Sequence, residues 1–161
     1  VFRYPHDVSQ FYVKRLVGMP GDVVTFADGT VSIQGAMPDA QVLEDDALAA
    51  FSIRRSADDR GQWMVRESAG APPRVLKINP FVRGRQPLNW DDAGIAAQCS
   101  STRGGAWECT VPEGHYLMLG DNRDASSDSR TWGFLSHDQV YGKAVRVLFN
   151  FDDPERAWLP L

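Results

Sequence analysis

Short apolar runs separated by Gly, Pro and Asp recur along most of the chain, and long runs with helical periodicity are scarce. Runs of this length are typical of β-strands, and the residues between them are those that turns prefer. Asp28-Gly29, for example, lies between two apolar runs and predicts a hairpin. We therefore predict a mostly β fold of antiparallel sheets or a partly open barrel, with strands over Phe11–Val17, Val23–Phe26 and Val31–Ile33 and a return of regular patterning over Trp107–Leu119.

The middle of the chain differs in pattern from its two ends. Residues 34–106 hold several turn clusters, scattered strand patterns and a short helical pattern at Leu43–Phe51. A length of 161 residues fits one domain that carries a large insertion. We predict a discontinuous β domain, residues 1–33 and 107–161, split by a β-rich insertion of residues 34–106, with one helical turn within Phe134–Val140.

Composition and charge exclude two classes of protein. The formal net charge is −4 and no run of Lys and Arg occurs, which argues against binding to nucleic acid. No apolar run approaches the roughly 18 residues that a spanning helix needs. The chain opens on Val1 in a strand-like pattern, with neither Met nor a signal peptide. We expect it to be a piece of a longer protein.

The two cysteines, Cys99 and Cys109, lie on either side of Gly104-Gly105. The glycine pair can turn the chain back and bring the two thiols together. A metal site needs four ligands, and no His lies near this pair. We favour a disulfide, which implies an oxidising compartment, with two free thiols as the alternative.

Two adjacent cations, Lys14 and Arg15, lie in the apolar run QFYVKRLVG. Both faces of the predicted strand are largely apolar, so we expect the strand to be covered on both sides. Arg15 keeps its proton and therefore needs a carboxylate partner. An amine pressed against apolar groups has a lowered pKa, so Lys14 can take a proton from a serine hydroxyl. The alternative is a Lys14 side chain that reaches water at a sheet edge.

A dense polar stretch, GDNRDASSDSRTWG over residues 120–133, follows the apolar run His115–Leu119. Its three Asp and two Arg residues fit a rigid loop braced by ion pairs and hydrogen bonds. A calcium-binding loop fails on spacing, because Ser127 and Gly133 occupy the positions of the required Gly and Glu. We expect no metal at this loop.

The segments YVKRLVGMPGD and GDNRDASSDSRTWG, in this order, resemble the motifs of bacterial type I signal peptidase (leader peptidase), a Ser–Lys endopeptidase. The likeness is strong over Val1–Ile33 and Trp107–Phe149. It is weak through residues 34–106, where the family carries a variable second domain. The resemblance implies a mostly antiparallel β fold split by that insertion.

The resemblance also implies roles for individual residues around the amine. Lys14 matches the general base of the family, and Ser126 matches a hydroxyl that hydrogen-bonds to this base and orients it. Tyr12 and Met118 match apolar neighbours that press on the amine. In each case the role is an expectation taken from the family.

The same likeness implies two supporting ion pairs, Asp128 with Arg130 and Asp121 with Arg15. One feature of the family is missing, because its nucleophilic serine belongs to a Ser-Met motif and no serine of this chain precedes Met. We expect the nucleophile, the oxyanion-hole donors and a membrane anchor to lie outside the chain, and the chain alone to be inactive. The alternative is a non-catalytic β-rich binding module of the same fold.

For the parent protein, the resemblance implies cleavage of signal peptides from secreted preproteins, at the surface of the bacterial inner membrane and on its extracytoplasmic face. A peptidase of the same fold specialised for one pilus or conjugation substrate is a further alternative. No metal and no organic cofactor is implied. The expected partners are preproteins and the membrane surface, without nucleic acid, and we expect a monomer.

Two other groups of residues invite a functional interpretation. Ser136-His137-Asp138 contains the residue types of a catalytic triad, but contiguous side chains diverge, so we interpret them as surface polar residues. The aromatic residues of the C-terminal part fit either core packing or an apolar patch on a bilayer, and both interpretations stay open. They are Trp132, Phe134, Phe149, Phe151 and Trp158.

Overall fold

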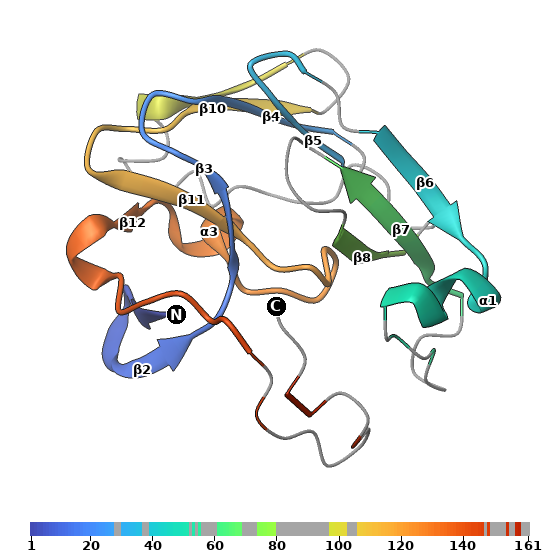
Figure 1. Cartoon of the computed structure of the whole chain (residues 1–161). Helices are drawn as coiled ribbons and strands as arrows, with labels where there is room; N and C mark the ends of the chain where they lie inside the picture. Colours follow the sequence, from blue (N-terminus) through green and yellow to red (C-terminus); the bar gives the residue numbers. More distant parts are fainter. Residues whose placement is uncertain are drawn as a thin grey trace.

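Antiparallel strands in four sheets are the main regular secondary structure of the described residues (Figure 1). The computed structural model describes residues 1–27, 30–36, 39–51, 53, 55, 61–68, 74–79, 97–102, 106–146, 148, 154 and 157–158. The sheets have the strand orders β1-β2, β5-β4-β10-β9, β12-β11-β3 and β6-β7-β8. The predicted mostly β, antiparallel fold is therefore confirmed, and the strands described close no barrel.

The four-stranded sheet carries the main core. It contains β4 (Val23–Ala27), β5 (Thr30–Ile33), β9 (Cys99–Ser101) and β10 (Trp107–Thr110). The β4–β5 pairing confirms the predicted hairpin, although its turn residues, Asp28 and Gly29, lie outside the described residues. Alternate side chains of β4 and β10 are buried, as a sheet with one covered face requires. They pack on apolar residues of β3 and β11 in one cluster.

The predicted single strand Phe11–Val17 is wrong. The chain forms β2 (Asp7–Tyr12), which pairs with β1 (Phe2–Tyr4), and then β3 (Arg15–Gly18), which pairs with β11 (His115–Leu119). The ladder breaks because the chain changes partner between the two strands, and Lys14 lies at this break. The expected cover on both faces is wrong as well.

Three apolar side chains around the break are exposed to solvent. They are Phe11 at 53%, Val13 at 65% and Leu16 at 44% relative exposure. The alternation of side chains along the sequence gave the predicted strand two apolar faces. In the structure, β2 and β3 belong to sheets of two and three strands, and these apolar side chains are not covered. The break thus gives Lys14 one apolar side and one side that faces outward.

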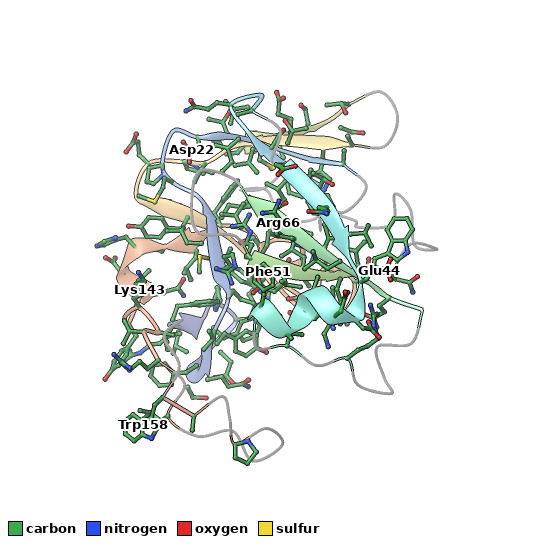
Figure 2. All side chains as sticks on the ribbon, turned by 45° about the vertical axis from the view of Figure 1, so that its right-hand side comes forward. Asp22, Glu44, Phe51, Arg66, Lys143 and Trp158 are labelled. Atoms are coloured by element: carbon green, nitrogen blue, oxygen red, sulfur yellow. A yellow bond between two sulfur atoms is a disulfide. The ribbon has the colours of Figure 1, made fainter. Side chains whose placement is uncertain are left out.

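The remaining sheet comes from the middle of the chain, where β6 (Asp39–Leu43), β7 (Trp63–Ser68) and β8 (Arg74–Ile78) pair in order. The helical pattern forms α1 (Asp45–Leu48) and η1 (Ala49–Phe51), whose apolar side chains pack with Leu43 and Met64. In Figure 2, Glu44 beside α1 lies on the opposite side of the molecule from Lys143. Since β9 also comes from residues 34–106 and pairs with β10, the division into two domains stays a prediction.

The last described elements are α3 (Ser129–Trp132), β12 (Leu135–Ser136) and η3 (His137–Gln139), the last of which is the predicted helical turn. Trp132 is buried at 3% exposure and packs in the core, so its place in a bilayer patch is excluded. Trp158 is exposed, whereas Phe149 and Phe151 lie outside the described residues. In the part of the chain that is described, no helix is long and apolar enough to cross a bilayer.

Candidate active site

The amine of Lys14 lies against the polar loop that follows β11. Its Nζ is 2.8 Å from Oγ of Ser126 and hydrogen-bonds to it, although 112 positions separate the two residues. The same Nζ lies 5.8 Å from the centroid of the Tyr12 ring. Because Lys14 occupies the break between β2 and β3, its side chain leaves the ladder and reaches the loop. The structure therefore brings together the residues that the two motifs contain.

The surroundings of Lys14 weaken its hold on a proton. Burial lowers the pKa of the amine below its ordinary value, because desolvation disfavours the charged form. The carboxylate of Asp128 opposes this shift, the Arg130 guanidinium adds to it, and Asp121 opposes it. The amine is thus biased towards the neutral form, in which its nitrogen can accept a proton.

Ser126 lies unusually close to the backbone of Gly120. A Cβ placed on Gly120 would lie 2.0 Å from Oγ and 2.5 Å from Cβ of Ser126, so no larger residue fits without displacing the serine. Gly120 follows β11 directly and begins the loop. The missing side chain at this position is what allows the Ser126 hydroxyl to lie where Lys14 can reach it.

Asp128 organises the loop from inside. This carboxylate is fully buried, caps α3, and accepts hydrogen bonds from the backbone N–H of Gly120 at 2.9 Å and of Arg130 at 3.2 Å. The guanidinium of Arg130 donates to both carboxylate oxygens, at 2.7 and 2.6 Å. Ser129 accepts a hydrogen bond from the Met118 backbone at 2.8 Å. These bonds tie the loop back onto β11, the strand it leaves.

Arg15 and Asp121 form the second pair that the sequence predicted. Nε and Nη2 of Arg15 each lie 2.7 Å from one carboxylate oxygen of Asp121, which is a bidentate geometry. The hydrogen bond to Asp121 raises the pKa of Arg15, so Arg15 stays charged. Both side chains are about two-fifths exposed, which limits the stability the pair provides.

Tyr12 and Met118 belong to one apolar cluster, and Tyr12 is its member with a contact to the Lys14 amine given above. Its buried members are Phe2, Met118, Trp132 and Leu135, and Tyr12 packs against them from the edge. The Tyr12 ring stacks on Tyr4 with centroids 4.5 Å apart. The cluster thus packs against Tyr12, and the Tyr12 ring lies near the Lys14 amine.

Other candidate residues lie in separate arrangements. His137 hydrogen-bonds through Nδ1 to the Tyr116 hydroxyl at 2.7 Å, within an exposed pair on the outer surface. The hydroxyl of Ser9 donates to Asp7 on the same strand, β2. Cys99 and Cys109 form a disulfide and lie directly opposite each other on β9 and β10. No group of three or more metal-ligating side chains is found among the residues described.

Sequence reasoning missed a buried ionic cluster beside the loop. Glu67 on β7 and Arg123 in the loop are each 1% exposed, and Nη2 of Arg123 lies 3.6 Å from Oε2 of Glu67. Nε of Arg74 on β8 donates to the same oxygen at 2.7 Å. The only sequence signal was an Arg in a loop of acidic residues, and nothing local to Glu67 indicates that it is buried.

Comparisons with known proteins come from sequence and from structure. A family model described as signal peptidase, peptidase S26, matches residues 1–149. A signal peptidase I of Pseudomonas fluorescens is 31% identical over 173 aligned residues, covering 99% of this chain and 51% of that protein. A signal peptidase I of Pseudomonas aeruginosa is 28% identical with the same coverage, 99% and 51%. The chain thus spans about half the length of these curated relatives.

A solved structure is also similar to the chain. The crystal structure of a signal peptidase I from Enterococcus faecalis V583 matches with a TM-score of 0.43 and 27% sequence identity. The match covers 89% of this chain and 89% of that one.

Proposed function

The chain belongs to the signal peptidase family, peptidase S26, and from this premise we propose that it forms the base-bearing part of an endopeptidase that removes signal peptides from preproteins. The observation that carries the proposal is the hydrogen bond of 2.8 Å between Nζ of Lys14 and Oγ of Ser126, made by a partly desolvated amine. In this proposal Lys14 is the general base, and Ser126 orients it.

The reaction needs a nucleophile that Lys14 can deprotonate. A serine hydroxyl from outside these 161 residues attacks the carbonyl carbon of the scissile peptide bond while its proton passes to the neutral Lys14 amine. The resulting ammonium then gives this proton to the leaving nitrogen, and the peptide bond breaks to leave an acyl-enzyme. Water, deprotonated by Lys14 in the same way, releases the acyl group and restores the serine.

Two observations support placing the nucleophile outside the chain. No serine here precedes Met, and the chain spans about half the length of its relatives. Ser126 itself orients Lys14 in this proposal. We expect the 161 residues alone to form no acyl-enzyme with a peptide that has small residues at positions −1 and −3. A covalent adduct on the isolated chain, detected by mass spectrometry, would contradict this placement.

The base is tested by Lys14→Met in the full-length protein, since Met matches the length and apolar stem of Lys but cannot accept the proton. We expect kcat to fall by about 10²–10⁴-fold, the range typical for general-base removal. The matched control is Lys143→Met, because Lys143 is an exposed lysine that follows η3 and is not part of either motif. Equal activity of both variants on a soluble peptide would refute Lys14 as the base, whereas a full-length parent protein without any activity would favour a non-catalytic binding module.

The membrane surface is part of the proposal because exposed apolar side chains lie on β2, directly after it, and on the segment after η3. Val8, Phe11 and Val13 are 53–65% exposed, Tyr141 is 72% exposed, and the Phe11 and Tyr141 rings lie 5.2 Å apart. Amphipathic surfaces of this kind suit a bilayer interface. The disulfide supports a location on the extracytoplasmic face.

Vesicle partition measures this surface directly. Replacing Phe11 and Tyr141 by Ser is expected to weaken partition into anionic lipid vesicles by about tenfold or more, because each aromatic ring loses its apolar burial. Trp63→Ser is the matched control, since Trp63 is 45% exposed but lies on β7 in a different sheet. Equal partition of both variants would show that the bilayer contacts the protein elsewhere.

A further inference from the structure

The loop that carries Ser126 is attached to the middle sheet of the protein by backbone pairing. The N–H of Lys77 on β8 donates to the Asp121 carbonyl at 2.9 Å, and the N–H of Arg123 donates to the Lys77 carbonyl at 3.0 Å. Lys77 and Asn122 form a parallel bridge. Figure 1 shows the segment that follows β11 running towards β8. A segment from the predicted insertion therefore borders the loop.

A buried ionic cluster lies at the same junction. Oε2 of Glu67 lies 3.6 Å from Nη2 of Arg123 and 2.7 Å from Nε of Arg74, its register partner on β8. Both Glu67 and Arg123 are 1% exposed. The Arg123 guanidinium also lies 6.0 Å from the centroid of Phe26, and that of Arg130 lies 5.5 Å from the same ring. The side chain of Arg123 thus joins β7 to the main core through the loop.

The charges of this cluster are held in place by one another. Burial lowers the pKa of Arg123 to about 10, with Glu67 opposing the shift, so Arg123 remains a cation at neutral pH. A buried cation is costly unless a charge of opposite sign lies close to it. Removing the Glu67 charge would take away the carboxylate that both Arg74 and Arg123 approach, and a movement of the loop would bring Arg123 back towards solvent.

We propose that Glu67 is a positioning residue for the base: through Arg123 it holds residues 120–126 against β8, and so keeps the Ser126 hydroxyl in reach of Lys14. The inference rests on the proposed function, because the loop it positions is the one that orients the base. Three short stretches, β7, β8 and the loop, therefore act as one unit. The middle segment of the chain then contributes to the site without touching substrate.

The test uses amide hydrogen exchange on the 161-residue chain together with an NMR titration of the Lys14 amine. Glu67→Gln is expected to speed exchange at the amides of residues 77 and 123 by about tenfold or more, because local opening of the loop becomes easier. Exchange in β4 and β10 is expected to stay within about twofold of the parent chain. The Lys14 pKa is expected to rise towards its ordinary value as Nζ becomes more solvated.

A second variant covers the case in which Glu67→Gln fails to fold. Arg123→Met leaves Glu67 paired with Arg74, so the buried charges remain balanced, yet it removes the side chain that attaches the loop. It is expected to produce the same exchange and titration changes. Asp39→Asn is the matched control, because Asp39 is an exposed carboxylate of the same sheet and pairs with Arg66. It is expected to change neither readout.

The outcomes separate this inference from the proposed function. If Lys14 of the parent chain titrates at its ordinary value, the proposed base is wrong, whatever the exchange rates show. If Lys14 has a lowered pKa that neither Glu67→Gln nor Arg123→Met changes, Glu67 does not position the base. Exchange that rises equally in all sheets of both variants would show a general loss of stability, and it would also overturn the inference.

Discussion

Lys14 carries an amine whose pKa is lowered by burial and further by Arg130, while Asp128 and Asp121 oppose the shift. Activity that depends on the neutral amine rises with pH through this pKa. Replacing Asp121 by Asn removes a group that raises the pKa, so we predict that the acidic limb of kcat/KM moves to lower pH. A pH–rate profile of the full-length protein measures this. A limb that moves to higher pH would contradict the assignment of Lys14 as the base.

The lowered pKa of Lys14 also makes the stability of the fold depend on pH. The folded pKa of Lys14 lies below its unfolded value of 10.5, so folding disfavours the protonated form. Lys14 therefore destabilises the fold by its full amount at pH values below its pKa in the folded state. This destabilisation disappears as the pH rises to the pKa of Lys14 in the unfolded chain. The proposed base is thus a residue that opposes folding at neutral pH, as is common at functional sites.

Gly120 sets the position of Ser126 by having no side chain. We predict that Gly120→Ala displaces Ser126, because the added Cβ would lie 2.0 Å from its Oγ. Crowding of this kind costs about 1–3 kcal/mol of stability, and loss of the Lys14 contact is expected to lower activity about 10²-fold. Thermal unfolding and peptide hydrolysis measure the two effects. Gly142→Ala is the control, since nothing lies within 4 Å of its added Cβ, and equal effects would refute the steric account.

At the scale of elements, two ion pairs brace one loop but differ in burial. Asp128 caps α3 and is buried with Arg130, whereas Asp121 and Arg15 are about two-fifths exposed. We predict that Asp128→Asn destabilises the protein by about 3–5 kcal/mol, because it leaves Arg130 buried with its charge uncompensated. Asp121→Asn should cost less than about 1 kcal/mol, since water screens an exposed pair. Urea unfolding of the two variants compares them, and equal losses would contradict this ranking.

Two predicted elements show which structural features a local sequence pattern can predict and which it cannot. The Asp-Gly turn predicted the β4–β5 hairpin because turn residues act locally. The strand predicted over Phe11–Val17 was wrong, because apolar alternation does not reveal that the chain leaves β1 as partner and joins β11. The break that results is what frees the Lys14 side chain. The proposed base therefore lies where the prediction from apolar alternation was wrong.

At the scale of the whole molecule, many local turn signals were enough to predict the fold class. They could not predict which segments distant in the sequence contact each other. The contact of Lys14 with Ser126 was expected only because the two motifs together resemble a family. The burial of Glu67 depends on Arg123, which lies 56 positions away by residue number, and on the side chains around both. Alternation cannot reveal an ionic contact between a strand and a distant loop, so the Glu67–Arg123 contact could be found only from the structure.

Breaking the disulfide between β9 and β10 shows whether a loss of stability in this sheet changes the environment of Lys14. Cys99 and Cys109 lie opposite each other across β9 and β10, with a sequence separation of 10. Closing a loop of this length is expected to stabilise the fold by about 2–3 kcal/mol, mainly through the unfolded chain. Cys99→Ala breaks the bond and leaves the buried Cys109 in its core position, so we predict a lower Tm with little change in the pKa of Lys14. Thermal unfolding and NMR titration measure the two. A large change in the Lys14 pKa would mean that β9 supports the base through the shared core of β10 and β11.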